Sequence, residues 1–112
     1  MVASISYVPE AGDIVWLHFD PQAGHEQAGH RPAIVLTPAA YNARARLCVC
    51  CPTTTQIKGY PFEVPISGRP PSVVLADHVK SLDWRSRKAV KKSRATPSEL
   101  AQVRAKLRAL IG

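Results

Sequence analysis

Residues able to take part in chemistry are concentrated in two short segments of the 112-residue chain. Segment 26–32 holds a carboxylate, an imidazole and a guanidinium, on Glu26, His30 and Arg31. Segment 52–56 holds three consecutive threonines followed by a glutamine. Guanidinium and hydroxyl groups donate hydrogen bonds to phosphate oxygens, and carboxylates and imidazoles transfer protons. By residue type alone, structural roles are more common: Arg31 as a strand-entry arginine paired with a carboxylate, His30 as a hydrogen-bonded loop histidine, and the threonines as ordinary strand residues.

Metal and thiol chemistry are not indicated. The three cysteines, Cys48, Cys50 and Cys51, are crowded together without a second cluster at zinc-ligand spacing, and the four histidines are scattered. The sequence contains no Gly-x-Ser-x-Gly element, no phosphate-binding glycine loop and no evident Cys–His pair. We therefore expect no metal, no cofactor, and buried, reduced thiols. In a strand, Cys48 and Cys50 would share one face and Cys51 would point to the other.

The elements that position these residues are short. Ten prolines separate brief apolar segments, which indicates a small antiparallel sheet with many turns. Segment 22–31 is polar and too long for a tight hairpin, so we expect a loop there. Pro65 indicates an edge position for its strand. Strands are expected at 14–19, 32–37, 47–54, 62–66 and, as one long or two short strands, 73–82, with a short helical turn within 38–46.

The C-terminal segment is predicted to be a helix. Thr96 is a typical N-cap residue, Pro97 suits the first helical position, and Glu99 completes a capping box. An apolar stripe at helical spacing follows and is expected to pack on the sheet; its members are Leu100, Val103, Leu107 and Leu110. These elements predict one domain, residues 1–112, of the α+β class: a curled, barrel-like antiparallel sheet with a C-terminal helix.

The charge of the chain is strongly asymmetric. Its net charge is +7, residues 1–30 contain no Lys or Arg, and ten of the fifteen basic residues lie from Lys80 onward. Such a basic half indicates a polyanionic partner, nucleic acid or an acidic protein segment, although a solvated basic face is the simpler explanation. No apolar run approaches the roughly 20 residues of a membrane span, and no secretory signal is visible. We expect a cytoplasmic protein with no membrane partner.

Three blocks of the sequence resemble the MazF/PemK toxins. They are Glu26–Ala33, Thr54–Val64 and Leu75–Ser81. The opening and closing residues also match: Tyr7-Val8-Pro9 with Gly12-Asp13, and Ile111-Gly112. The resemblance covers nearly the whole chain, and blocks of seven or more residues in order make it specific.

The resemblance implies a type II toxin–antitoxin endoribonuclease that cuts single-stranded RNA, chiefly mRNA, at short sequences without a ribosome or a metal ion. The implied fold is a small SH3-like barrel of the CcdB/PemK type, shared with plasmid toxins that poison DNA gyrase. The implied assembly is a homodimer that binds RNA in a groove beside the subunit interface. The acidic, disordered tail of the cognate antitoxin would occupy the same groove.

The resemblance also assigns catalytic residues. The essential arginine of the family falls on Arg31, the essential hydroxyl on Thr54, and a loop glutamate on Glu26. The implied reaction is attack of the 2′-OH on the adjacent phosphorus, leaving a 2′,3′-cyclic phosphate and a 5′-OH. A guanidinium suits the crowded, doubly charged phosphorane, whereas its pKa above about 12 argues against a role as general base. Either Glu26 or His30 is expected to transfer the proton.

RNA contacts are expected around these residues. We predict Phe19 as a stacking surface, with a place in the core as the equal alternative, and Asp20 and Asn42 as readers of base edges. Further contacts to phosphates or bases are expected from His30, Thr53, Gln56, Lys58 and Lys80. The basic stretch 84–94 would either steer RNA, anchor the acidic tail of the antitoxin, or form a solvated face. His18 and the Pro70-Pro71 turn depart from the pattern of the family, which affects base preference more than chemistry.

Two other functions remain open from the sequence. The first is a non-catalytic toxin of the same fold that binds and inhibits DNA gyrase. The second is a small barrel that binds RNA or an acidic peptide without turnover. Cleavage that requires Arg31 and Thr54 would separate the nuclease from both.

Overall fold

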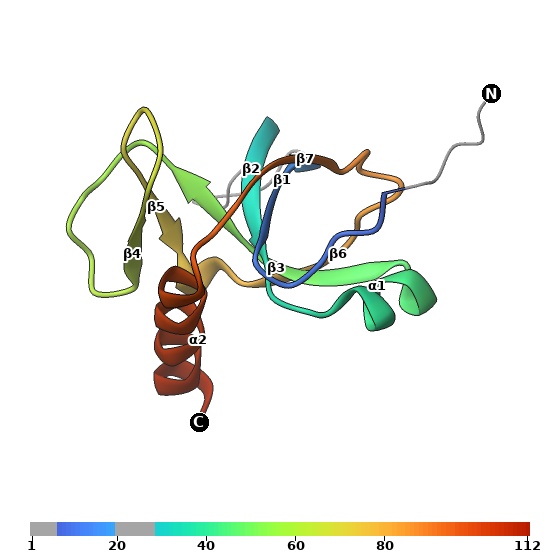
Figure 1. The fold of residues 1–112 in the computed structure, drawn as a ribbon. Helices are drawn as coiled ribbons and strands as arrows, with labels where there is room; N and C mark the ends of the chain where they lie inside the picture. Colours follow the sequence, from blue (N-terminus) through green and yellow to red (C-terminus); the bar gives the residue numbers. More distant parts are fainter. Residues whose placement is uncertain (1–6, 20–28) are drawn as a thin grey trace.

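The computed structural model describes residues 7–19 and 29–112. Along the chain, the elements are β1 (Asp13–Phe19), β2 (Gly29–Val35), α1 (Ala39–Ala45), β3 (Leu47–Thr54), β4 (Glu63–Ile66), β5 (Ser72–Leu75), the 3-10 turn η1 (Ala76–His78), β6 (Lys80–Asp83), β7 (Val90–Arg94) and α2 (Pro97–Ile111). Figure 1 shows a strongly curled sheet, with α2 beside β4 and β5 and with α1 at the opposite end of β3. The predicted α+β class is confirmed.

The sheet has seven strands, and every strand pair is antiparallel. Its order is β4-β5-β3-β2-β1-β7, with β6 paired to β3 off this path. The long strand β3 is the centre, because its first half pairs with β6, its middle with β2 and its last two residues with β5. The curl brings the β6–β7 connection onto β1, where the amide of His18 donates to the carbonyl of Arg87 at 3.1 Å. This curl makes the sheet barrel-like.

Two apolar cores lie on opposite faces of the sheet. One contains Val15, Leu17 and Phe19, which alternate along β1, together with Cys48 and Cys50 and four further buried residues. The other contains Ile14 and Cys51 and lies beneath α2. The three cysteines are therefore buried, unpaired and divided between the two faces, as the spacing predicts.

Helix α2 begins as the sequence predicts. The hydroxyl of Thr96 accepts from the amide of Glu99 at 3.1 Å, and the Glu99 carboxylate accepts from the amide of Thr96 at 2.8 Å. Glu99 also accepts from the amide and hydroxyl of Ser67, which attaches the start of the helix to the β4–β5 connection. Burial would raise the pKa of Glu99, but these hydrogen bonds lower it overall. Most of the predicted stripe lies in or against the second core, but Leu110 is 46% exposed.

The N-terminal segment is tied to two strands through Asp13. This buried carboxylate accepts from the hydroxyl of Tyr7, the amide of Glu10 and, at 2.7 Å, Nη1 of Arg94, and Nζ of Lys91 lies 3.7 Å away. Burial alone would raise the pKa of Asp13, but the donors and cations around it hold that pKa below its ordinary value. The network joins β1, β7 and the segment that precedes them.

Two details of the predicted elements differ from the structure, and one alternative that the sequence left open is decided. Strand β2 begins at Gly29 and ends at Val35, so His30 and Arg31, which were expected in a loop, are strand residues paired with His18 and Leu17. The rest of the expected loop, 22–28, lies outside the described residues. Of the two alternatives predicted for segment 73–82, the structure has two short strands, separated by η1. Strand β7 was not predicted, because all five of its residues are exposed and mostly charged, and it carries no apolar alternation.

The remaining strand predictions are confirmed to within two residues, and β4 is the edge strand that Pro65 indicates. None of the helices formed by residues 7–19 and 29–112 is long and apolar enough to cross a membrane.

Candidate active site

Arg31 and Thr54 lie on neighbouring strands and line one cavity of about 330 Å³. Strands β2 and β3 pair Ala33 with Pro52, and continuing this antiparallel register places Arg31 opposite Thr54. The Thr53 hydroxyl donates to the carbonyl of Pro32 at 3.2 Å, which extends the contact between the strands toward the cavity. The register of two strands therefore brings together residues that are 23 positions apart in the sequence.

The hydroxyl of Thr54 is oriented by the next turn of chain. It accepts a hydrogen bond from the amide of Gln56 at 3.1 Å. Within the part of the chain that the structure describes, it donates to no other group, so its proton is available to an oxygen in the cavity.

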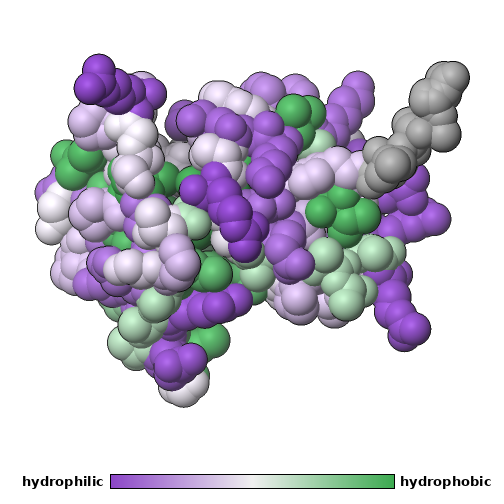
Figure 2. Space-filling view, viewed as in Figure 1, coloured by the Kyte–Doolittle hydropathy of each residue, from purple (hydrophilic) through white to green (hydrophobic). Residues whose placement is uncertain are grey.

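We call this cavity the arginine pocket. Besides Arg31, two cations line it, Arg69 and Lys92, and none of the lining residues among those described is a carboxylate. The positive field of three cations favours an anion such as a phosphate group. The face of the molecule seen in Figure 2 is largely hydrophilic, with apolar residues in small, separate patches.

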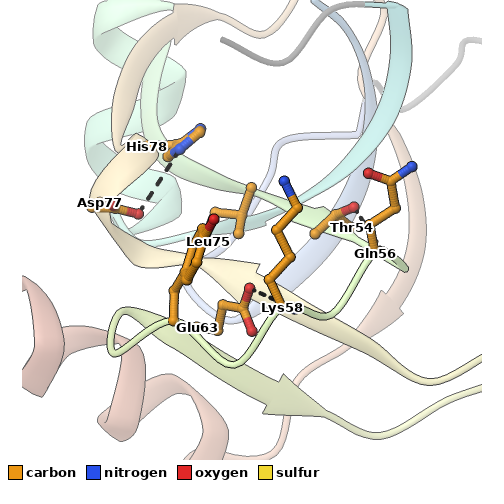
Figure 3. A pocket seen from close by; sticks show the side chains of 8 residues that line it. Thr54, Gln56, Lys58, Glu63, Leu75, Asp77 and His78 are labelled. Atoms are coloured by element: carbon orange, nitrogen blue, oxygen red, sulfur yellow. Dashed lines mark hydrogen bonds and ion pairs between the residues drawn. The ribbon is translucent and has the colours of Figure 1, made fainter. Parts of the chain in front are cut away.

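A second cavity of about 440 Å³, which we call the lysine pocket, adjoins the first. Thr54 lines both, and two of the predicted RNA contacts, Gln56 and Lys58, line the second (Figure 3). The Glu63 carboxylate accepts from the amides of Lys58 and Gly59 at 3.1 and 2.9 Å and so holds the segment that carries Lys58. The hydroxyl of Thr54 thus stands between a cationic pocket and a pocket of mixed charge.

A row of aromatic side chains leads away from the arginine pocket. Trp16, which lines that pocket, lies 5.1 Å from the His30 ring, and His30 stacks on His18 at 4.4 Å and 22° between planes. Nζ of Lys92 lies 5.9 Å from the centroid of Trp16. Trp16 was not predicted as a residue of the site, although alternation along β1 places its side chain on the face opposite the buried Leu17.

Two of the predicted RNA contacts, Phe19 and Asn42, are buried in the structure. The ring of Phe19 is 2% exposed, lies in the first core and is covered by the Lys80 ammonium at 5.8 Å, so it offers no stacking face in this conformation. Asn42 is fully buried: its Nδ2 donates to the carbonyls of Pro9 and Thr37 at 2.8 and 2.9 Å, and its Oδ1 accepts from the Thr37 hydroxyl at 2.7 Å. The amide of Asn42 is a structural group, because every contact to a base would break these bonds.

The other predicted site residues differ in where they lie relative to the two pockets. Thr53 lines the arginine pocket, although its hydroxyl is engaged by Pro32. Lys80 lines neither pocket. Asp20 and Glu26 lie outside the described residues, so their predicted roles stay predictions.

The basic stretch 84–94 has several structural roles. Trp84 is buried and donates from Nε1 to the carbonyl of Asn42 at 3.0 Å, and Arg94 binds Asp13. Nη1 of Arg87 donates to the carbonyl of His18 at 3.0 Å. Lys92 alone among its cations lines one of the two pockets just described. The stretch is therefore partly a structural strand and partly the rim of the arginine pocket.

Fold and site together define an α+β protein with a curled antiparallel sheet and a pocket lined by three cations. Residues 7–19 and 29–112 contain no group of three or more His, Cys, Asp or Glu side chains placed to hold a metal ion. Residues 10–111 match the family model described as the PemK-like, MazF-like toxin of type II toxin–antitoxin systems. The chain belongs to this family, and the resemblance noted in the sequence is confirmed.

Relatives and solved structures agree with this assignment. The chain is 55% identical over 107 residues to the endoribonuclease toxin MazF of Escherichia coli (strain K12), which covers 95% of this chain and 96% of the relative. It superposes on the crystal structure of MazF (Form-I) from Deinococcus radiodurans with a TM-score of 0.90 and 56% identity, over 96% of this chain and 99% of that one. The MazE-MazF (Form-II) structure from the same organism gives a TM-score of 0.86 and 56% identity, over 96% and 98% of the two chains. The expected fold is confirmed.

Proposed function

We propose that this chain is the toxin of a type II toxin–antitoxin pair and an endoribonuclease that cleaves single-stranded RNA, including mRNA, without a metal ion or the ribosome. The observation that carries the proposal is the meeting of Arg31 and Thr54 at one cationic cavity. Support comes from the 55% identity to a protein named as an endoribonuclease toxin, over nearly the full length of both chains.

The geometry supports a reaction driven by the 2′-OH of the RNA itself. This hydroxyl attacks the adjacent phosphorus, the bond from phosphorus to the 5′ oxygen breaks, and a 2′,3′-cyclic phosphate and a 5′-OH result. The Arg31 guanidinium stabilises the charge that develops on the phosphoryl oxygens, and the Thr54 hydroxyl donates to one of them. Glu26 or His30 transfers the proton. DNA has no 2′-OH, so it can occupy the site without being cut.

The remaining pocket residues position the strand. Gln56 and Lys58 contact the nucleotide in the lysine pocket, while Thr53 and His30 flank the arginine pocket. The active form is a homodimer, and the cognate antitoxin inhibits it by placing an acidic, disordered tail in the cationic cavity. Support for an antitoxin partner comes from the MazE-MazF structure that this chain resembles. The site of action is the cytoplasm, where mRNA is available.

The test is incubation of purified protein with a long RNA in EDTA, followed by mapping of the new ends. We expect discrete cuts with 5′-OH ends, and a loss of at least about 100-fold in rate for Arg31→Ala. Thr54→Val removes the hydroxyl with little change in shape and should be as slow, whereas Thr54→Ser should retain activity. Arg44→Ala, which removes an exposed arginine of α1, is the matched control.

Intact RNA, with protein shown to be free of antitoxin, would refute the proposal. Inhibition of DNA gyrase by the same sample would then support the non-catalytic toxin. Retention of wild-type rates by both Arg31→Ala and Thr54→Val would show that the site is elsewhere.

A further inference from the structure

The lysine pocket contains a carboxylate that the proposed chemistry does not use. Asp77 and His78 lie at one end of this pocket and Thr54 and Gln56 at the other, with the Lys58 side chain between them (Figure 3). A volume of about 440 Å³ lies in the range of small-ligand sites. Because Thr54 also lines the arginine pocket, a phosphate bound there places the neighbouring base at this second pocket.

The two carboxylates of the pocket differ in what they bind. Both oxygens of Glu63 are engaged, because they accept from the amides of Lys58 and Gly59. No hydrogen bond reaches the Asp77 carboxylate from residues 7–19 or 29–112, and Nε2 of His78 lies 4.0 Å from its Oδ1. Its side chain is 47% exposed, so a ligand can reach it. Among the residues that the structure describes, Asp77 is thus an acceptor that no donor occupies.

The backbone under Asp77 is held rigidly, although its side chain is exposed. The preceding residue, Ala76, is fully buried, and its amide donates to the carbonyl of Phe62 at 3.0 Å. The carbonyl of Ala76 lies 3.7 Å from Sγ of Cys51, in the core beneath α2. The turn η1 therefore presents Asp77 at a fixed place on the pocket wall, and a fixed acceptor can discriminate between ligands.

We propose that Asp77 determines specificity by accepting a hydrogen bond from the exocyclic amino group of the base in the lysine pocket. Cytosine and adenine carry such an amino group next to a ring nitrogen that accepts, and His78 is placed beside Asp77 to donate to that nitrogen. Uracil presents a carbonyl oxygen where cytosine has the amino group, and this oxygen repels the carboxylate. The identity of the ligand as nucleic acid rests on the proposed function.

The test compares two ligands that differ in this group. Short single-stranded oligo(dC) and oligo(dU) lack the 2′-OH and stay intact, and their binding is followed by fluorescence anisotropy at one fixed salt concentration. We expect the protein to bind oligo(dC) roughly tenfold more tightly, the effect of one charge-assisted hydrogen bond at a partly exposed site. Asp77→Asn should remove the preference, because an amide can pair with either base.

The matched control is Asp83→Asn. It raises the net charge by the same amount, and an asparagine can still accept from the amides of Arg85 and Ser86, as Asp83 does at 3.0 and 2.9 Å. This variant should keep the preference for oligo(dC). Equal binding of the two oligonucleotides by the unaltered protein, no binding of either, a preference that survives in Asp77→Asn, or an equal loss in Asp83→Asn would each overturn the proposal.

This outcome is separate from that of the cleavage test. Discrete RNA cuts without any base preference in binding would overturn only the role of Asp77. A base preference that depends on Asp77, in a protein that leaves RNA intact, would overturn only the nuclease.

Discussion

Replacing Asn42 by alanine is expected to destabilise the fold, rather than to remove an RNA contact. The side chain makes three hydrogen bonds, a buried one to the carbonyl of Pro9 and two partly buried ones, to the carbonyl of Thr37 and from the hydroxyl of Thr37. At a net contribution of about 1 kcal/mol for each bond, the free energy of unfolding should fall by about 3 kcal/mol. Alanine also leaves the two carbonyls without a donor, which adds to the loss.

Urea unfolding measures this loss directly. With a typical slope of about 2 kcal/mol per molar urea, a loss of about 3 kcal/mol lowers the midpoint by about 1.5 M. Tryptophan fluorescence is a local probe, because Nε1 of Trp84 donates to the backbone carbonyl of Asn42. All variants are compared at one protein concentration, since dissociation of a dimer would otherwise shift the midpoint.

The control variant is altered on α1, the helix that carries Asn42. Arg44→Ala changes an exposed residue on the same helix and should alter the stability by less than about 0.5 kcal/mol. An unchanged midpoint for Asn42→Ala, combined with a loss of RNA cleavage, would refute the structural role and restore the prediction that Asn42 reads a base.

Three further predictions concern the frame of the site. Thr96→Ala removes the N-cap of α2 and should lower the free energy of unfolding by about 1 kcal/mol, measured by urea titration; Thr96→Ser should not. Because the pKa of Asp13 is lowered in the folded state, its carboxylate stabilises the fold above the unfolded pKa of about 4, and this contribution is lost as the pH falls through the lower folded value. Asp13→Asn should therefore be less stable at neutral pH and show a weaker loss of stability in acid by thermal unfolding; an unchanged acid profile would contradict the network. Burial raises the pKa of Cys51 to about 12, so a thiol reagent should modify it only on unfolding, and rapid modification of the native protein would contradict the buried position.

Local signals were enough to predict much of this protein. Helix α2 could be predicted because its signals are local. Thr96 and Glu99 form a capping box at its start, and the apolar spacing follows directly after them. Strand β3 has the predicted bounds because a nearly continuous apolar run favours a strand buried on both faces. The resemblance to the toxin family could also be recognised from the sequence, because the matching residues form uninterrupted blocks.

Tertiary structure alone decided how these parts meet. Arg31 lies opposite Thr54 only through the register of β2 on β3, and no local pattern specifies which strands pair. Strand β7 exists because the exposed edge of β1 accepts it, not because its own charged residues favour a strand. In the sequence, Asn42 is a polar residue on a short predicted helix. Its structural role depends on its burial against distant segments such as Pro9, and burial is decided by how the whole chain packs.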